Sequence, residues 1–343
     1  MSSKNPHINP GFKKKALVTF SIQECKEGLE KARPDVLAYL ISKAESIKEE
    51  DQNFVRQLIS EVQVFHPVKK IAISGSPGVG KSSFIDSFGQ YLLDQGNRIA
   101  VLPVDPSSYI SKGSILGDKT RMESISRSDM AFIKPMPSSL ALGGLAPASS
   151  IATMICERSC FDYIILETVG VGQSEVEARN MVDMFLLLLQ PGGGDDLQGI
   201  KRGIMELADL FIVTKSDGTL AENAKETTRQ IKQAMGLLLK NSYGWKAKVL
   251  KHSADLNEGN QAIHESIDAY FNFMAEENRL SSLRKDQNFQ MFADQSQSLL
   301  LKHVLKNKSI SLALQSIKKK LENNDIEALA AINELEDVLN ALQ

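Results

Sequence analysis

The sequence predicts an α/β fold in which a mostly parallel sheet is flanked by helices, with helical extensions at both ends. Short apolar runs bounded by Gly, Pro or Asp alternate with helical stretches between residues 67 and 275, a pattern typical of a parallel sheet. Residues 21–65 place apolar side chains at spacings of three and four. No strand pattern follows residue 276, so we expect a helical arm over residues 276–343.

The N-terminal extension, residues 1–66, is expected to begin with a mobile polar tail that lacks the apolar segment of a secretory signal. Apolar residues at helical spacing then run from Val36 to Ile47 and from Phe54 to Val62, and Pro34 marks a helix start. Six strands are expected in the central part, at residues 70–74, 98–104, 163–166, 184–189, 210–214 and 247–250. The arm should contain a helix over residues 287–306 and one or two more over 311–342.

The arm has an apolar stripe that must be covered. Its members are Leu314, Ile317, Leu321, Leu329, Ile332, Leu335, Val338, Leu339 and Leu342. Two readings stay open, because the stripe can pack on the chain's own core or form a self-association surface.

Composition and charge indicate a soluble protein with a large core. The 343 residues include 40 Lys and Arg against 42 Asp and Glu, a formal net charge of -2, and 42% of them are hydrophobic. Coating nucleic acid or an anionic membrane needs an excess of basic residues, so we expect neither partner. The longest apolar run, Met184 to Leu189, is far shorter than the roughly 20 residues that span a bilayer.

The cysteines favour a cytoplasmic location. Cys25, Cys156 and Cys160 are too few, and odd in number, for a disulfide framework. Cys156 and Cys160 lie four residues apart and could share a helix face. A metal site there would need further ligands nearby, so we expect buried or half-buried helix cysteines.

One motif predicts phosphate binding. Directly after the first expected strand come Gly75, Ser76, Pro77, Gly78, Val79, Gly80, Lys81 and Ser82, which match G-x-x-x-x-G-K-[ST], and an amphipathic helical run follows. The glycines let backbone N–H groups turn toward the phosphates, the lysine reaches the β- and γ-phosphates, and the serine hydroxyl binds Mg2+. The sequence therefore predicts a P-loop NTPase fold that binds a nucleoside triphosphate with Mg2+.

Acidic residues end two further strands. Asp105 follows the second strand and Glu167 ends the third, at the edge of the sheet where the phosphate loop lies. Either carboxylate could bind Mg2+ or accept a proton from the attacking water. The Gly170 amide, three residues after Glu167, is placed to sense a γ-phosphate.

A third motif predicts guanine rather than adenine. Thr214-Lys215-Ser216-Asp217 resembles the N-K-x-D motif of GTPases, with Thr in place of Asn. Asp217 could accept from guanine N1–H and from the exocyclic amino group, a donor pair that adenine lacks, while the Lys215 stem lies along the base. Thr214 weakens this reading, because Asn normally ties this loop to the phosphate loop. Ser253-Ala254 fits a loop that contacts guanine through its backbone, so GTP and GDP are the expected ligands.

Five segments together resemble the MeaB/ArgK family. They are residues 75–83, 104–108, 114–122, 167–175 and 194–201. Members are G-protein chaperones of adenosylcobalamin-dependent methylmalonyl-CoA mutase, long called LAO/AO transport ATPases. The resemblance extends over about residues 25–343. It implies a homodimeric GTPase with a C-terminal dimerisation arm, which gates cobalamin delivery to an acyl-CoA mutase and protects that enzyme.

The resemblance also implies roles for individual residues. The site would hold phosphate and Mg2+ through Lys81, Ser82 and Ser83, with acidic groups from Asp105, Asp118 and Glu167. Residues 190–201 would form a third switch loop that contacts the mutase. In it, Lys201 either stabilises charge during hydrolysis or is a solvated lysine, whereas Asp195 and Asp196 are expected to face solvent or the partner.

Hydrolysis without a partner is expected to be slow. Val171 follows Gly170 where many small GTPases place a glutamine, and an apolar side chain cannot orient water. We expect an intrinsic rate on the order of 10^-4 to 10^-2 per second, which a partner accelerates. The rival functions are a phosphotransferase, a metal-insertion GTPase, which the five scattered histidines disfavour, and a membrane-targeting GTPase, which would need a basic or Met-rich amphipathic segment.

Overall fold

The computed structural model describes residues 19–46, 48–64, 66–105, 122–137, 147–168, 170, 173–192, 202–235 and 243–340. The chain divides into two compact units, Met1–Tyr270 and Phe271–Gln343. The predicted N-terminal tail, residues 1–18, lies outside the described residues. None of the described helices has the length and apolar character needed to cross a bilayer.

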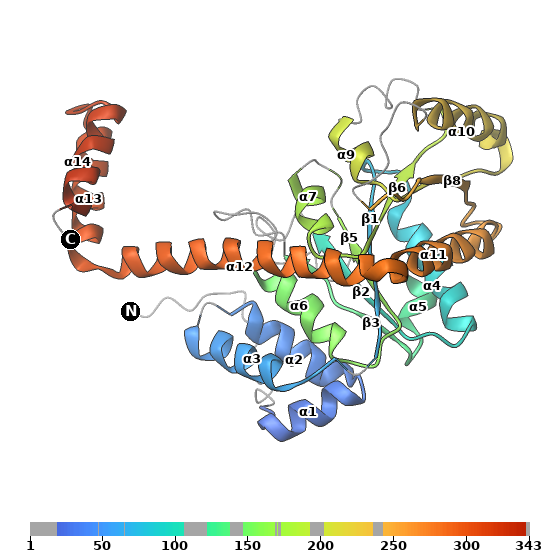
Figure 1. Cartoon of the computed structure of the whole chain (residues 1–343), viewed down its shortest axis with the longest axis horizontal. Helices are drawn as coiled ribbons and strands as arrows, with labels where there is room; N and C mark the ends of the chain where they lie inside the picture. Colours follow the sequence, from blue (N-terminus) through green and yellow to red (C-terminus); the bar gives the residue numbers. More distant parts are fainter. Residues whose placement is uncertain are drawn as a thin grey trace, which may run out of the picture. The chain divides into compact units, whose positions relative to one another are not determined.

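A parallel sheet forms the centre of the first unit (Figure 1). Its strands are β1 (Lys69–Ser74), β2 (Ile99–Asp105), β3 (Ala131–Ile133), β4 (Met136–Pro137), β5 (Tyr163–Glu167), β6 (Met184–Leu189), β7 (Leu210–Val213) and β8 (Lys248–Lys251). The order is β3-β2-β5-β1-β6-β7-β8, and β4 pairs with β2. The six predicted strands are confirmed to within one residue at each end. Strands β3 and β4 have three and two residues, too few to show a pattern in the sequence.

The register of the central strands places the predicted site residues side by side. Strand β1 lies between β5 and β6, and Ile73 of β1 is paired with Glu167 on one side and Leu186 on the other. The loop that follows β1 therefore emerges beside the carboxyl end of β5, where Glu167 is the last residue.

Three helices precede the sheet. They are α1 (Ile22–Glu30), α2 (Pro34–Ala44) and α3 (Glu49–Glu61). Helix α1 begins with a capping box, in which Ser21 and Glu24 each bond the other's backbone N–H. Pro34 is the first residue of α2, as predicted, because its fixed φ and missing N–H cost nothing there.

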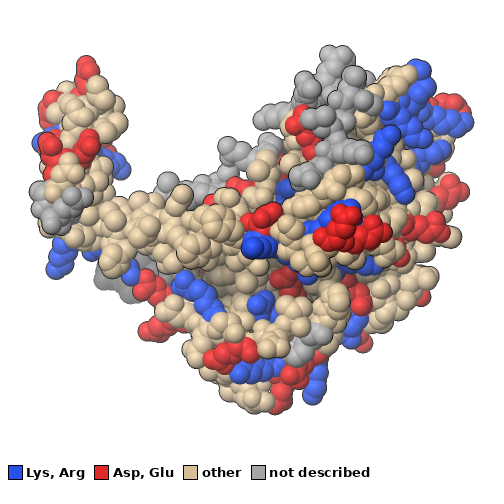
Figure 2. All heavy atoms as spheres, in the orientation of Figure 1, with Lys and Arg blue, Asp and Glu red and all other residues tan. Residues whose placement is uncertain are grey.

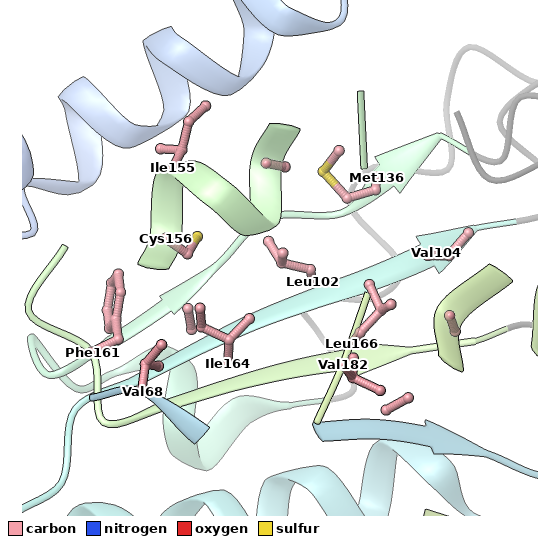
Figure 3. Close-up of a cluster of buried hydrophobic side chains, with 14 of the residues drawn as sticks. Val68, Leu102, Val104, Met136, Ile155, Cys156, Phe161, Ile164, Leu166 and Val182 are labelled. Atoms are coloured by element: carbon pink, nitrogen blue, oxygen red, sulfur yellow. The ribbon is translucent and has the colours of Figure 1, made fainter. Parts of the chain in front are cut away.

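One face of the sheet is covered by α6 (Pro147–Glu157) and the N-terminal helices, and α2 packs on α6. Figure 3 shows Ile155 and Cys156 of α6 above Leu102 of β2 and Ile164 of β5. All four side chains are buried, and the same continuous core includes the apolar faces of α1, α2 and α3. The helical extension is thus part of the core of the first unit.

Helix α4 (Lys81–Asp94) covers the other face. Ile99 and Val101 of β2 point to this second face, because successive side chains of a strand alternate between its two faces, and both are buried. A β-carbon on Gly89 of α4 would lie 3.1 Å from Ile99 Cδ1 and 3.0 Å from Ile125 Cγ2, so this glycine allows the helix to approach the sheet closely. The remaining elements of this unit are α5 (Glu123–Ser126), α7 (Gln173–Arg179), α9 (Arg202–Leu207), η4 (Gly218–Leu220), α10 (Ala221–Met235) and α11 (Asn260–Ala275), which continues into the second unit.

The cysteine prediction needs a correction. Cys156 lies buried in α6, but the helix ends at Glu157, so Cys160 is not on the same helix face. Its Sγ instead donates to the backbone carbonyl of Glu30 at 2.6 Å. The chain turns after Glu157 to enter β5, and this turn is not visible in the spacing of the two cysteines.

The second unit is helical, as predicted. It contains η5 (Glu276–Asn278), α12 (Arg279–Lys306), α13 (Lys308–Glu322) and α14 (Ala328–Asn340). Helix α12 begins at Arg279 rather than at residue 287. Helices α13 and α14 pack on each other, so Ile317 and Ala331 are buried, whereas Leu329 and Ile332 stay 72% and 60% exposed.

Candidate functional site

The phosphate loop, residues 75–80, connects β1 to α4. Gly75, Gly78 and Gly80 have φ values of 153°, 81° and 96°, and the latter two lie in the left-handed region that favours glycine. Gly80 is the N-cap residue of α4 and has no side chain to bond the first-turn N–H groups. Those donors and the positive end of the helix dipole are therefore available to an anion.

Lys81 lies over this loop. Its Nζ donates to the backbone carbonyls of Gly75 at 2.8 Å and Ser76 at 3.3 Å. Burial lowers the pKa of the Lys81 ammonium, and the carboxylates of Glu167 and Glu175 oppose this shift. A charged group that is half-desolvated and held by two carbonyls is well suited to exchange them for phosphate oxygens.

Ser82 and Glu167 meet beside Lys81. The Ser82 hydroxyl donates to Glu167 Oε1 at 3.2 Å, and the Glu167 side chain is buried at the end of β5. A hydroxyl and a carboxylate oxygen are hard ligands of the kind that Mg2+ takes, with phosphate and water completing its shell. These two residues therefore fit the predicted cation.

Gly170 lies directly against the phosphate loop. A β-carbon on Gly170 would lie 2.1 Å from the carbonyl oxygen of Gly75 and 3.4 Å from Lys81 Nζ. Any side chain would force the two segments apart, and φ at Gly170 is 87°. The structure thus brings Gly170 to the place where a γ-phosphate sensor is expected.

Glu175 is a site residue to which the sequence assigned no role. It lies in α7, its side chain is fully buried, and Ser74 at the end of β1 donates to its Oε1 at 3.2 Å. It also contributes to the charge around Lys81. Its position eight residues after Glu167 placed it in the family motif, but its burial depends on how α7 packs against β1.

The loop after β7 carries the predicted base motif, residues 214–217, and is called the base-recognition loop below. Two side chains tie it to the phosphate loop. Thr214 Oγ1 lies 2.7 Å from the Val79 carbonyl oxygen and 3.2 Å from that of Leu189. Lys215 Nζ donates to the Gly78 carbonyl at 2.7 Å. The threonine hydroxyl therefore makes a connection between the two loops of the kind that asparagine normally makes.

Asp217 is held by the loop that follows β8. The Ser253 hydroxyl donates to Asp217 Oδ2 and accepts from the backbone N–H of Leu256 at 3.1 Å. Ser253 and Glu258 form a small antiparallel bridge that closes this loop around Ala254. One carboxylate oxygen of Asp217 is thus fixed by the protein.

Several predicted residues lie outside the described part of the chain. They are Asp118, Val171, Asp195, Asp196 and Lys201. Asp105 is the last residue of β2, but its side chain is also outside the description. At the start of the predicted third switch, the Gly192 N–H bonds Thr227 Oγ1 at 3.1 Å.

Thr214→Val is expected to lower the free energy of unfolding by about 1–2 kcal/mol, because it leaves a buried carbonyl without its donor. Urea denaturation measures this change. Thr214→Ser keeps the hydroxyl and serves as the control. A valine variant as stable as the wild type would show that the hydrogen bond to Val79 contributes nothing.

His252, beside Ser253, predicts a pH dependence of stability. The residue is 1% exposed, and burial lowers the pKa of its imidazole to about 4. The unfolded chain therefore binds a proton between pH 6.5 and 4 that the folded chain does not. The contribution of the neutral His252 to the free energy of unfolding is complete above pH 6.5. It is lost as the pH falls, by up to about 3 kcal/mol at pH 4. Unfolding curves at stepwise pH should show a shallower decline for His252→Asn than for the wild type, and parallel declines would contradict the assignment.

Comparisons with known proteins agree with this geometry. The family model described as "Methylmalonyl Co-A mutase-associated GTPase MeaB" matches residues 37–309. The mouse (Mus musculus) protein named "Methylmalonic aciduria type A homolog, mitochondrial" is 43% identical over 252 residues, which are 74% of this chain and 61% of the mouse protein. The chain thus spans about three fifths of that relative.

Two further relatives match nearly the whole chain. "GTPase ArgK" of Escherichia coli (strain K12) is 34% identical over 325 residues, 94% of this chain and 97% of the relative. The solved structure titled "Crystal structure of LAO/AO transport system kinase" has a TM-score of 0.73 at 27% identity, and the match covers 95% of this chain and 100% of that one.

Proposed function

Because the chain belongs to the MeaB family of methylmalonyl-CoA mutase-associated GTPases, we propose that it is a GTP-driven chaperone of an adenosylcobalamin-dependent acyl-CoA mutase. It binds GTP and GDP with Mg2+, hydrolyses GTP slowly when alone, and gates cobalamin delivery to its client. Two observations support this proposal. Lys81 and the Ser82–Glu167 pair lie together at the phosphate loop, and the loop after β7, which carries the predicted base motif, is tied to the same phosphate loop.

Each group in the site has a defined task. Lys81 exchanges the carbonyls of Gly75 and Ser76 for phosphate oxygens and stabilises the charge that develops there during hydrolysis. Ser82 and Glu167 hold Mg2+, which supplies further positive charge to the phosphates when bound. Asp105 and Asp118 complete the acidic side, and Lys201 contributes when the client docks.

The test is single-turnover hydrolysis of γ-labelled GTP by the chain alone and with a cobalamin-dependent acyl-CoA mutase. We expect label in inorganic phosphate and a faster rate with the mutase. Equal rates would contradict stimulation by the client. Label transferred to an acceptor other than water would indicate a phosphotransferase, the rival function.

We also propose that residues 276–343, which make up most of the second unit, are a homodimerisation arm. Large apolar side chains stay exposed along α12, including Phe289 at 73% and Phe292 at 69%. On the face that Figure 2 shows, most of α12 carries no Lys, Arg, Asp or Glu. Large exposed apolar side chains gathered along one helix are typical of an interface with a second protein. The proposed division of the chain is an extension over residues 1–66, a G domain over 67–275 and the arm over 276–343. The proposed location of the protein is cytoplasmic.

Sedimentation of the wild type and of Phe292→Asp tests the arm. The wild type is expected to sediment as a dimer and the variant as a monomer, since a buried unpaired charge costs several kcal/mol. A monomeric wild type would contradict the proposal. Gln290→Asp, on an exposed polar position of the same helix, is the matched control.

A further inference from the structure

A series of side-chain hydrogen bonds connects α4, the helix that begins at the phosphate loop, to the loop that holds Asp217. His252 Nε2 lies 3.0 Å from Asn260 Oδ1, and Asn260 Nδ2 donates to Ser87 Oγ at 3.1 Å. Ser87 Oγ in turn donates to Asn257 Oδ1 at 3.0 Å. His252 and Asn260 are buried, and none of these four residues belongs to a nucleotide-binding motif.

The chemistry of the groups sets the direction of each bond. Asn260 Oδ1 can only accept, so His252 Nε2 carries a proton, and the amide nitrogen can only donate, so Ser87 Oγ accepts from it. The hydroxyl proton of Ser87 then goes to Asn257. A single amide thus bonds both His252 and Ser87 of α4. An apolar side chain at position 260 would remove both bonds and leave only the longer direct approach of Ser87 Oγ to His252 Nε2, at 3.4 Å, to join the two residues.

The backbone of His252 continues this connection into the base-recognition loop. Its N–H bonds the Val213 carbonyl at 2.8 Å, and its own carbonyl accepts from the Ser216 N–H at 3.2 Å. The next residue is Ser253, whose hydroxyl holds Asp217. The placement of His252 therefore determines where the Asp217 carboxylate lies.

The His252 ring is fixed from a second side by the same helix. Phe84, in the first turn of α4, packs edge-on against the imidazole with ring centroids 4.8 Å apart. Phe84 N–H bonds the Gly80 carbonyl at 2.9 Å, at the end of the phosphate loop. Helix α4 thus packs on the ring through Phe84, and its Ser87 is joined to the ring through Asn260 of α11.

We propose that Asn260 is a positioning residue for base recognition. By joining His252 to Ser87, it sets the distance between the Asp217 carboxylate and the phosphate loop, so that guanine is read while its phosphates are bound. The inference rests on the proposed binding of guanine nucleotides. It assigns a specificity role to a residue that acts through His252 and Ser253.

The test compares the binding of GDP and of inosine diphosphate, which lacks the 2-amino group, by calorimetry. In Asn260→Ala, GDP affinity is expected to fall about three- to tenfold. The preference for GDP over inosine diphosphate is expected to shrink, because a displaced Asp217 no longer reads the amino group. The kcat at saturating GTP should stay within about twofold, since the phosphate site is unchanged.

Gln261→Ala is the matched control. The Gln261 amide is exposed and donates to Glu265 within α11 at 2.9 Å, so both affinities are expected to match the wild type. Ser87→Ala removes the α4 end of the connection at a half-buried position. It tests the proposal if Asn260→Ala does not fold. It should shift the nucleotide preference in the same direction.

An unchanged preference for GDP over inosine diphosphate in the folded variants would overturn the positioning role, even if their melting temperatures fall. The wild type is measured with ADP in parallel. Binding of ADP as tight as that of GDP would overturn the proposed function itself, so the two failures are distinguishable.

Discussion

Lys81→Ala is expected to lower the rate of GTP hydrolysis by about 10²–10³-fold, the usual effect of removing one preorganised donor from a developing charge. The Lys81 ammonium is held at the phosphate loop by the Gly75 and Ser76 carbonyls, so its charge is already in place when a nucleotide binds. The variant also loses the interaction that binds the phosphates. Phosphate release at saturating GTP, together with the Kd of GDP, measures both effects.

Lys232→Ala is the control for this experiment. Lys232 is an exposed lysine of α10, and its removal changes the net charge by the same amount. We expect hydrolysis within about twofold of the wild type, as for most surface substitutions. Residual hydrolysis close to the wild-type rate in Lys81→Ala would show that the phosphate loop does not act through this lysine.

Asp217→Asn is expected to exchange guanine for xanthine specificity. In the proposed complex Asp217 accepts from N1–H and from the 2-amino group of guanine, whereas asparagine would present an N–H donor to that amino group, which cannot accept it. Xanthine has a carbonyl oxygen at that position and pairs with the amide. We expect the affinity for GDP to fall by about 10²-fold or more, since buried polar groups are left unpaired, and the affinity for xanthosine diphosphate to rise.

Ser253 makes this exchange structurally conservative. Its hydroxyl, which donates to the Asp217 carboxylate, can donate equally to the carbonyl oxygen of asparagine. Competition between labelled GDP and unlabelled diphosphates gives the relative affinities. Asp129→Asn, at an exposed turn before β3, should retain the wild-type preference. Retention of guanine preference by Asp217→Asn would show that another group reads the base.

The site could be predicted where a residue's role follows from its immediate neighbours in the chain. The phosphate loop joins a strand directly to a helix, so its glycines lie next to Lys81 and Ser82 in the first turn of α4, as the order of the residues predicts. Glu167 was predicted at a strand end, and the register with β1 brings it to Ser82. These positions depend on local backbone geometry and on the rule that parallel strands end at a common edge.

Other roles depend on contacts between segments that are far apart in the sequence. Thr214 departs from the N-K-x-D motif, but its hydroxyl lies beside the Val79 carbonyl, 135 residues away along the chain. Cys160 was expected on a helix that ends three residues before it. In both cases the spacing of residues was clear, but the path of the chain between them was not.

By itself, the sequence determined the fold class, because strand and helix patterns alternate along residues 67–275, and the phosphate loop, because that loop is a short continuous segment. Tertiary structure alone decided that Glu175 is buried against Ser74 and that Asn260 joins α4 to the base-recognition loop. The physical reason is that a side chain's hydrogen-bond partners are set by which strands and helices pack together, and here the order β5-β1-β6 brings the ends of distant segments to one point.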